Sequence, residues 1–172
     1  KGVDIASKLS EKEIQTAQNV FQRVQDLRIN AGAEISSSVM HSLLKSCPQL
    51  KILDLQNYRC VSADAFRTTD LYPCIEELDL SGNKPITDDA LMPLLRRCPN
   101  LRILNISYCA QLTKHSVIAA AQHCRHLQQF HRLTTQAIYR FGGWYEPEND
   151  WYSPLFTHCT KLTHVSISDC VT

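Results

Sequence analysis

The stretch that decides the fold is Cys98-Pro99-Asn100-Leu101-Arg102-Ile103-Leu104-Asn105-Ile106-Ser107-Tyr108-Cys109. Its core-type residues Leu101, Leu104 and Ile106 are spaced three and then two positions apart. Cys98 stands three residues before the first of them, and Cys109 stands three residues after the last. The same spacing returns along the chain, and a spacing that returns indicates a repeat protein.

Six triplets with this spacing can be aligned. They are Val24/Leu27/Ile29, Leu50/Leu53/Leu55, Ile75/Leu78/Leu80, Leu101/Leu104/Ile106, Leu127/Phe130/Arg132 and Leu162/Val165/Ile167. Their first members lie 26, 25, 26, 26 and 35 residues apart, so four of the five intervals are nearly equal. Arg132 is the one member of the wrong chemical type. A second shared segment, Ile86 to Leu91 in its best copy, also returns, so both halves of the unit repeat.

Each unit is predicted to be a short strand followed by a helix. In Leu-x-Leu the two apolar side chains point to one face, because a strand alternates. A Ser, Thr or Asp after the turn can cap the helix N-terminus, and Leu91, Leu94 and Leu95 then recur at helical spacing. Cys98 is predicted to end this helix, because Pro99 cannot continue it. One unit cannot bury its own apolar face, so the units must stack.

The full pattern, Cys-x-x-Leu-x-x-Leu-x-Leu-x-x-Cys-x-x-Leu-Thr, resembles the cysteine-containing leucine-rich repeats of the F-box leucine-rich-repeat proteins and their relatives. The resemblance extends from about Leu9 to Thr172. It implies an α/β fold: a right-handed leucine-rich-repeat solenoid, or horseshoe, of about six repeats, with a parallel sheet on the concave side and helices on the convex side.

The resemblance also implies a function. It implies a non-enzymatic protein-interaction module, and beyond binding it implies recruitment of substrates to a Skp–cullin–F-box ubiquitin ligase. Nothing in these 172 residues resembles the Leu-Pro-rich helical pattern of an F-box, so contact with ligase subunits would depend on an F-box outside them. The alternative is a structural repeat subunit of a large stable assembly.

Composition limits the remaining choices. A chain of 172 residues predicts one domain, and a net charge of +1 gives no general reason to expect nucleic acid or a membrane surface as partner. No apolar run of 18 residues is present. Most of the eight cysteines follow the repeat period, which favours buried, reduced thiols and a cytoplasmic or nuclear protein.

No cofactor or metal is predicted. The cluster His123, Cys124, His126 and His131 fits no standard zinc spacing, and Cys124 is a repeat position that should be buried. The sequence contains no Gly-rich phosphate loop and no Gly-x-Ser-x-Gly motif. These observations favour a protein that is not an enzyme.

The two ends of the chain depart from the regular unit. Residues 1–23 are predicted to be an N-terminal capping helix or a partial repeat, with a Ser10–Glu13 capping box and a first segment, Lys1 to Leu9, too short to close a repeat. After Ile167 the sequence stops in mid-repeat, which predicts an open strand edge that further repeats or a partner would cover.

The fifth unit carries an insertion. The interval of 35 residues leaves about nine extra residues near 136–146, and the next helix aligns from Pro147 to His158. The insertion contains the aromatic residues Phe141, Trp144 and Tyr145. They are expected either to anchor a protein partner or to fold back over the gap that Arg132 leaves in the core.

The outward residues of the strands give the second candidate site. Asp54, Glu77 and Asp79 form an acidic zone that Asp26 extends, and His131, Arg132 and His164 form a more basic one. Ile52 and Ile103 accompany the acids, although a solvated face seldom uses isoleucine twice in one row. We predict that a protein partner with basic residues around an apolar anchor binds here. The residues predicted for this concave-face site are Ile52, Asp54, Glu77, Asp79, Ile103, Asn105 and His131.

Overall fold

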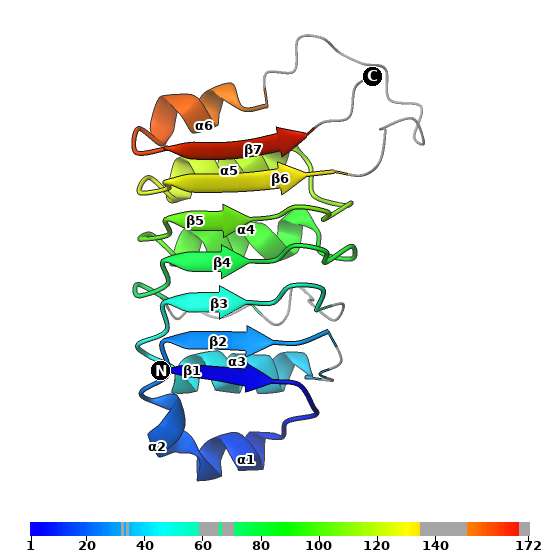
Figure 1. Cartoon of the computed structure of the whole chain (residues 1–172), viewed down its shortest axis with the longest axis vertical. Helices are drawn as coiled ribbons and strands as arrows, with labels where there is room; N and C mark the ends of the chain where they lie inside the picture. The colour runs from blue at the N-terminus through cyan, green and yellow to red at the C-terminus, as the bar shows by residue number, and fades with distance from the viewer. Residues whose placement is uncertain (32, 34, 59–65, 67–70, 135–150, 169–172) are drawn as a thin grey trace.

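The computed structural model describes residues 1–31, 33, 35–58, 66, 71–134 and 151–168. Helices and strands alternate along most of the chain (Figure 1). The strands are β1 (Gly2–Ile5), β2 (Asp26–Ile29), β3 (Ile52–Asp54), β4 (Glu77–Asp79), β5 (Ile103–Asn105), β6 (Gln129–Leu133) and β7 (His164–Ser168). The helices are α1 (Glu11–Thr16), α2 (Gln18–Phe21), α3 (Ser37–Ser46), α4 (Asp88–Arg97), α5 (Lys114–His123) and α6 (Ser153–His158).

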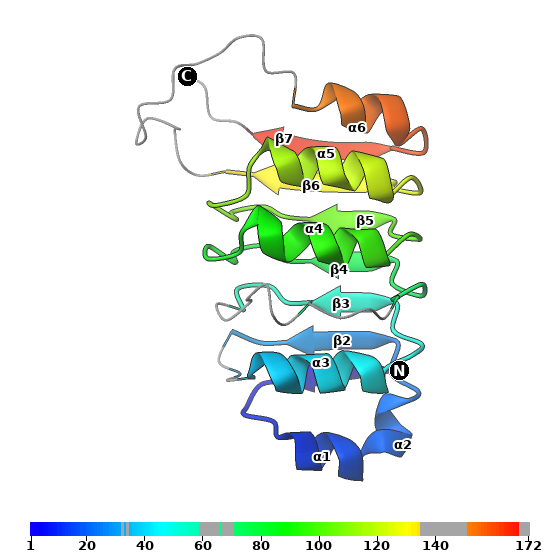
Figure 2. The ribbon, with the colours of Figure 1, turned by 180° about the vertical axis from the view of Figure 1, so that it is seen from behind.

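The seven strands form one parallel sheet in chain order, β1 to β7. Equivalent repeat positions pair with each other: Leu53 lies opposite Leu78, which lies opposite Leu104. The helices cover one face of this sheet and leave the other open (Figures 1 and 2). The predicted α/β solenoid is therefore confirmed, with a sheet face and a helix face.

The inward leucines form the core between the sheet and the helices. Leu53, Leu78, Leu104 and Phe130 are at most 1% exposed, as are Leu91, Leu94 and Leu95 of α4. Burying one such side chain contributes about 2 kcal/mol. Because each repeat supplies the same positions, the core runs continuously from one repeat to the next.

The N-terminal expectation was wrong in one respect. Lys1 to Leu9 does close a repeat, because β1 pairs in parallel with β2 and places Val3 and Ile5 opposite Leu27 and Ile29. The capping box is present as predicted: the Ser10 amide donates to the Glu13 carboxylate at 2.8 Å. The helical segment that follows the capping box is divided at Ala17 into α1 and α2.

The repeat cysteines are core residues, as predicted. Cys47, Cys98, Cys124 and Cys159 each follow the last residue of a helix and are at most 3% exposed. Burial raises the pKa of the Cys98 thiol to about 12, so this thiol stays protonated and unreactive at neutral pH. Cys74, which does not follow the repeat period, is exposed. Cys60 and Cys170 lie outside the described residues.

A left-handed turn follows the strands. Asn57, Gly82 and Tyr108 occupy the same position in successive repeats and have φ values of 56°, 76° and 60°. A β-carbon on Gly82 would overlap the side-chain amide of Asn57, so the stacked turns leave room there only for glycine.

The residue after this turn ties neighbouring repeats together. Asn83 donates through its side-chain amide to the carbonyls of Leu55 and Leu80 at 2.7 and 2.8 Å. Cys109 takes the same position in the next repeat, where its thiol donates to the Leu80 carbonyl at 3.1 Å. This position therefore bonds the turn backbone of its own and the preceding repeat.

The fifth unit accommodates Arg132 inside the core. Arg132 is only 6% exposed, and its guanidinium lies 5.1 Å from the ring centre of Trp151. It also donates to the Tyr152 hydroxyl at 2.9 Å and to the Leu112 carbonyl. Trp151 and Tyr152 therefore cover this position. They precede α6 instead of lying on it, because that helix begins at Ser153 and not near Pro147.

Candidate protein-binding surface

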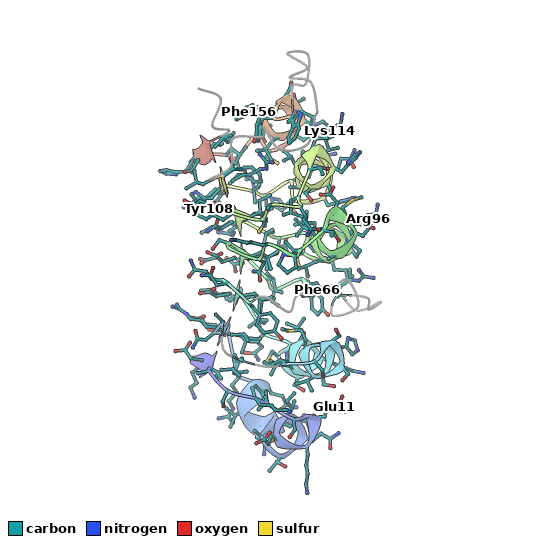
Figure 3. The ribbon with its side chains drawn as sticks, turned by 90° about the vertical axis from the view of Figure 1, so that its right-hand side faces the viewer. Glu11, Phe66, Arg96, Tyr108, Lys114 and Phe156 are labelled. Atoms are coloured by element: carbon teal, nitrogen blue, oxygen red, sulfur yellow. The ribbon has the colours of Figure 1, made fainter. Side chains whose placement is uncertain are left out.

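Two outward rows of side chains cross the sheet face. Strand alternation and the parallel register place every second residue in line. The first row is Gly2, Asp26, Ile52, Glu77, Ile103, Gln129 and His164, and the central row is Asp4, Arg28, Asp54, Asp79, Asn105, His131 and Ser166. Figure 3 shows these strands on the side of the molecule opposite the helices. The seven residues predicted for the concave-face site all lie in these two rows.

The N-terminal part of this face is acidic. We call Asp4, Asp26, Asp54, Glu77 and Asp79 the acidic patch; it spans β1 to β4. Arg28 is the one Lys or Arg within the two rows, and it pairs with Asp26 at 3.2 Å.

The carboxylates act on that arginine. The hydrogen bond and charge of Asp26 raise the pKa of the Arg28 guanidinium, and the charges of Asp54 and Asp4 add to this effect. Five carboxylates against one guanidinium leave the patch with a net charge of −4. A negative field of this kind favours approach of a basic partner.

Three of the predicted polar residues also have structural roles. Asp54, Asp79 and Asn105 each accept a hydrogen bond from the backbone amide two residues later, at 3.0, 2.8 and 3.1 Å. Asn105 also donates to the second oxygen of Asp79 at 2.9 Å. These side chains therefore fix the turns at the ends of β3, β4 and β5.

Glu77 differs from these three residues. Within the described part of the chain its carboxylate accepts no hydrogen bond, and it lies between Ile52 and Ile103 on the neighbouring strands. Both isoleucines are half-buried. A carboxylate flanked by two partly exposed apolar side chains is the arrangement that a lysine or arginine with a long aliphatic stem fits best.

The predicted basic zone is smaller than expected. His131 and His164 lie on the sheet face beside Asn105 and Gln129, but Arg132 points into the core and must be removed from this zone. Strand alternation places it there, since it is the residue next to His131. The aromatic residues Phe141, Trp144 and Tyr145 lie outside the described residues.

Two features of the molecule were not foreseen from the sequence. The first is the contribution of Asp4 to the sheet face, which needed β1 to be recognised as a strand. The second is a polar network on the opposite side, where Asp88 of α4 accepts hydrogen bonds from Thr113 and Ser116 at the start of α5.

This network links two helices and does not resemble a catalytic triad. His115 Nδ1 lies 3.9 Å from Asp88 and 3.0 Å from the Thr113 hydroxyl, but the Thr113 and Ser116 hydroxyls both donate to Asp88 and not to the imidazole. A nucleophile would have to donate its proton to the base. The network therefore ties adjacent repeats together.

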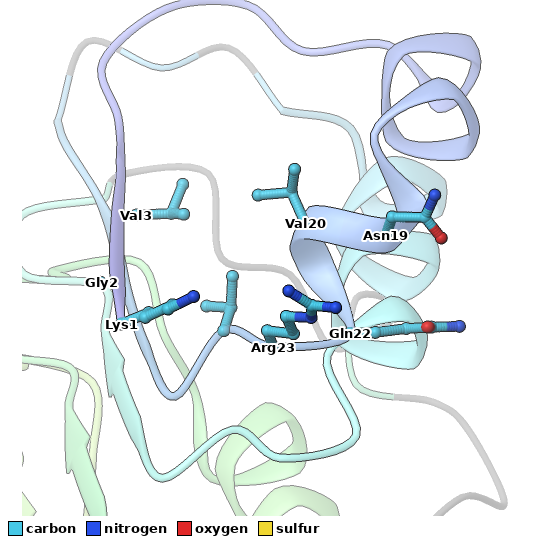
Figure 4. A pocket seen from close by; sticks show the side chains of 8 residues that line it. Lys1, Gly2, Val3, Asn19, Val20, Gln22 and Arg23 are labelled. Carbon is cyan, nitrogen blue, oxygen red and sulfur yellow. The ribbon is translucent and has the colours of Figure 1, made fainter.

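Two hollows lie away from the sheet face. One, of about 810 Å³, opens between β1 and α2 and is lined by residues that include Val3, Val20 and Arg23 (Figure 4). It contains no acid and so offers no acid–base pair. The other, of about 400 Å³, lies at the turns that lead into the strands.

Neither a metal site nor a membrane span is found among the described residues. They contain no group of three or more His, Cys, Asp or Glu side chains arranged to hold a metal ion. No helix in the same part of the chain is long and apolar enough to cross a bilayer.

Comparison with known proteins identifies the fold. The family model described as "Leucine Rich repeat" matches residues 73–95, which contain β4 and most of α4. The fold is a leucine-rich-repeat solenoid. The matched segment contains the turn and helix start that the sequence pattern singled out.

Two curated relatives share part of the chain. "Antagonist of mitotic exit network protein 1" of Candida glabrata is 38% identical over 53 residues, which is 31% of this chain and 10% of the relative. "Lysine-specific demethylase 2A" of Xenopus tropicalis is 27% identical over 119 residues, which is 64% of this chain and 10% of the relative. The chain thus spans about a tenth of the length of each relative.

Proposed function

We propose that this protein is a non-enzymatic protein-interaction module whose partner binds the acidic patch on the sheet face. The observation that carries the proposal is Glu77, a carboxylate with no structural hydrogen bond, held between the half-buried Ile52 and Ile103. The leucine-rich-repeat fold supports the proposal, because its open sheet presents an extended surface for another protein.

The chemistry of the patch indicates the kind of partner. Its net charge of −4 favours a segment with several lysines or arginines, and Ile52 and Ile103 favour an apolar residue among them. The charges would mainly accelerate association, whereas burial of the apolar anchor would supply about 1–3 kcal/mol. Asn105 and His131 would lie at the C-terminal border of the contact.

We further propose that the bound protein is a substrate recruited to an F-box-type ubiquitin ligase, with the F-box outside these 172 residues. The cysteine-containing repeat pattern supports this reading. The buried protonated thiols of Cys98 and its equivalents fit a reducing compartment, so we place the protein in the cytoplasm or nucleus. Co-purification of Skp and cullin subunits with the product of the complete gene would test it, and their absence would contradict it.

The alternative is a structural subunit of a stable assembly. In its favour, Phe156 of α6 and Val165 of β7 are 57% and 36% exposed, whereas the equivalent residues Leu95 of α4 and Leu104 of β5 are buried. A stable assembly would cover such a surface. A stoichiometric complex that survives size-exclusion chromatography at high salt would favour this role over transient recruitment.

Charge reversal at Glu77 tests the main proposal. We expect Glu77→Lys to reduce capture of the partner at least tenfold in affinity purification, because it places a positive charge in the centre of the contact. Asp89→Lys makes the same charge change on the helix face and is the matched control. Equal capture by both variants, with unchanged melting temperatures, would refute binding at the acidic patch.

A further inference from the structure

The turns that lead from each helix into the next strand form a second charged surface, separate from the acidic patch. We call these turns the basic rim; they lie along the left edge of Figure 1. Their six segments, 21–25, 45–51, 71–76, 96–102, 123–128 and 158–163, contain eight Lys or Arg residues and one acid, Glu76. The whole chain has 18 Lys or Arg and 17 acids, so positive charge is concentrated on this rim.

Helix ends account for only part of this concentration. Lys45, Arg96 and Arg97 lie in the last turns of helices, where a cation interacts favourably with the helix dipole. Arg97 also donates to the Pro93 carbonyl at 2.8 Å, and Arg96 of α4 contacts His123. The location of Arg96 on the helix side is visible in Figure 3. These residues have local reasons for their charge.

A second group of cations lies beyond the helix ends, so interaction with a helix dipole does not explain their positive charge. Lys51, Arg102 and Lys161 line the cleft of about 400 Å³, together with His126. Lys51 and Arg102 are about half exposed, with 52% and 53% of their side-chain surface accessible. They do not contribute to the core, and no helix terminus requires them.

The repeat geometry brings these residues together in two adjacent rows. Backbone hydrogen bonds of 2.7–2.8 Å link Lys51, Glu76, Arg102 and Gln128, which stand immediately before four consecutive strands. Two residues earlier in each repeat stand Asn100, His126 and Lys161. Neighbouring parallel strands lie about 4.8 Å apart, so Arg102 and Lys161, which stand two repeats apart on either side of His126, are separated by about 10 Å at the backbone. Their long side chains can span this separation and contact one ligand together.

The hydrogen bond between Lys161 and His126 fixes which atoms in the cleft can donate. Lys161 donates to Nδ1 of His126 at 3.1 Å, because an ammonium group can only donate. This leaves the Nε2–H of His126 as a donor. The cleft is thus lined by four hydrogen-bond donors: the Arg102 guanidinium, the His126 imidazole, the Gln128 amide and the Lys161 ammonium.

The single acid of the cleft decides which anion fits. Glu76 already pairs with Lys51 at 3.6 Å and with Arg102 at 3.5 Å. A carboxylate ligand would bring the same charge that Glu76 supplies and would gain little from displacing it. A phosphoryl group carries up to two negative charges and three acceptor oxygens, so it can bind Arg102 and Lys161 even with Glu76 present.

From this geometry we propose that the basic rim is a binding site for a phosphorylated segment of a protein, with a phosphoryl group held by Arg102, His126 and Lys161. The site is distinct from the acidic patch and does not depend on it. A partner could therefore place basic residues on the sheet face and a phosphorylated residue on the rim, which would make its binding depend on phosphorylation.

Peptide binding to the 172-residue chain tests this proposal. The probe is a fluorescein-labelled decapeptide with two phosphoserines in a glycine–serine background, measured by fluorescence anisotropy. Its unphosphorylated form and its aspartate form serve as comparisons. We expect the phosphorylated form to bind at least tenfold more tightly than either, and Arg102→Gln and Lys161→Gln each to weaken it about tenfold. Lys84→Gln, which removes an exposed charge from the opposite turns, should leave binding unchanged.

Three results would overturn the proposal. The first is equal affinity for the phosphorylated and unphosphorylated peptides. The second is phosphopeptide binding that Lys84→Gln weakens as much as Arg102→Gln does, because the attraction would then be non-specific. The third is tighter binding of a single-stranded DNA decamer to the same residues, which would point to nucleic acid. Thermal unfolding followed by circular dichroism ensures that each variant compared is folded.

Discussion

At the residue scale, the turns after the strands show how strongly neighbouring repeats constrain single positions. Gly82 has a φ of 76° and its missing side chain leaves room for Asn57 of the preceding repeat. We predict that Gly82→Ala lowers the free energy of unfolding by about 2 kcal/mol, because it adds both an unfavourable φ and a steric overlap. Urea denaturation measures this loss.

Gly2→Ala is the control for this prediction. An added β-carbon at Gly2 would meet Asp26 atoms at 3.6–3.8 Å, which is ordinary contact. The variant should therefore unfold within about 0.5 kcal/mol of the unsubstituted chain. Similar losses at Gly2 and Gly82 would show that the stacked turns are not the cause.

Asp88 is a second residue whose environment has a measurable consequence. Burial alone would raise the pKa of its carboxyl group, but hydrogen bonds from Ser116 and Thr113 outweigh this and hold the pKa below the ordinary value of 3.8. The unfolded chain therefore takes up the proton first as the pH falls. The stabilisation is complete above the unfolded-state pKa and is lost as the pH falls through the folded-state pKa.

The direction of this pKa shift can be tested by measuring stability as a function of pH. Between pH 6 and pH 3 the unsubstituted chain should lose more stability than Asp88→Asn does, by about 1 kcal/mol or less because the group is partly exposed. Melting temperatures measured at several pH values report the difference. Parallel pH profiles for the two proteins would show that the Asp88 network does not stabilise the folded state.

At the scale of elements, the sequence predicted the regular repeats and failed at the ends of the pattern. β4, β5 and the helices α4 and α5 that follow them were recognisable, because the apolar triplets and the helix-ending cysteines Cys98 and Cys124 are intact there. β1 was missed, although Val3 and Ile5 alternate like the other strand pairs, because the first residue of its triplet would precede Lys1. Two apolar residues two positions apart are too common for their spacing alone to identify a strand of the repeat.

For Arg132, the sequence predicted the position but not the residues that surround it. Its position in the triplet correctly indicated a core site, and its charge suggested a gap. The residues that complete the site, Trp151 and Tyr152, lie about twenty positions later, and no local spacing predicts a cation over an aromatic ring at that separation. Likewise, Asp54 and Asp79 bond the backbone of the following turn, whereas Glu77 does not. All three are acids in predicted strands, so the sequence alone did not separate these two roles.

The start of α6 should depend on Arg132. The amides of Leu155 and Phe156 both donate to the Tyr152 carbonyl, and Tyr152 is held by Arg132. We predict that Arg132→Leu accelerates hydrogen exchange at Leu155 and Phe156 at least tenfold, because the leucine fills the core but cannot bind the Tyr152 hydroxyl. Exchange in α4 should not change. Equal protection of α6 in both proteins would contradict this role.

At the scale of the whole molecule, the stacked repeats separate opposite charges into two surfaces. The acidic patch lies on the sheet face and the basic rim lies on the turns that precede the strands, although the chain as a whole carries a net charge of only +1. The net charge of the whole chain therefore gave no indication of either surface. The parallel register creates them, since it places equivalent positions of every repeat in line.

The central claim is that a protein partner binds the sheet face at Glu77 and its flanking isoleucines. The most direct measurement is site-specific photocrosslinking with p-benzoylphenylalanine at Ile103, on the sheet face, and at Lys114, at the start of α5. We predict one discrete protein adduct from position 103, with none from position 114, and loss of that adduct in Glu77→Lys. The same adduct from both positions, or an adduct that Glu77→Lys does not reduce, would contradict the claim.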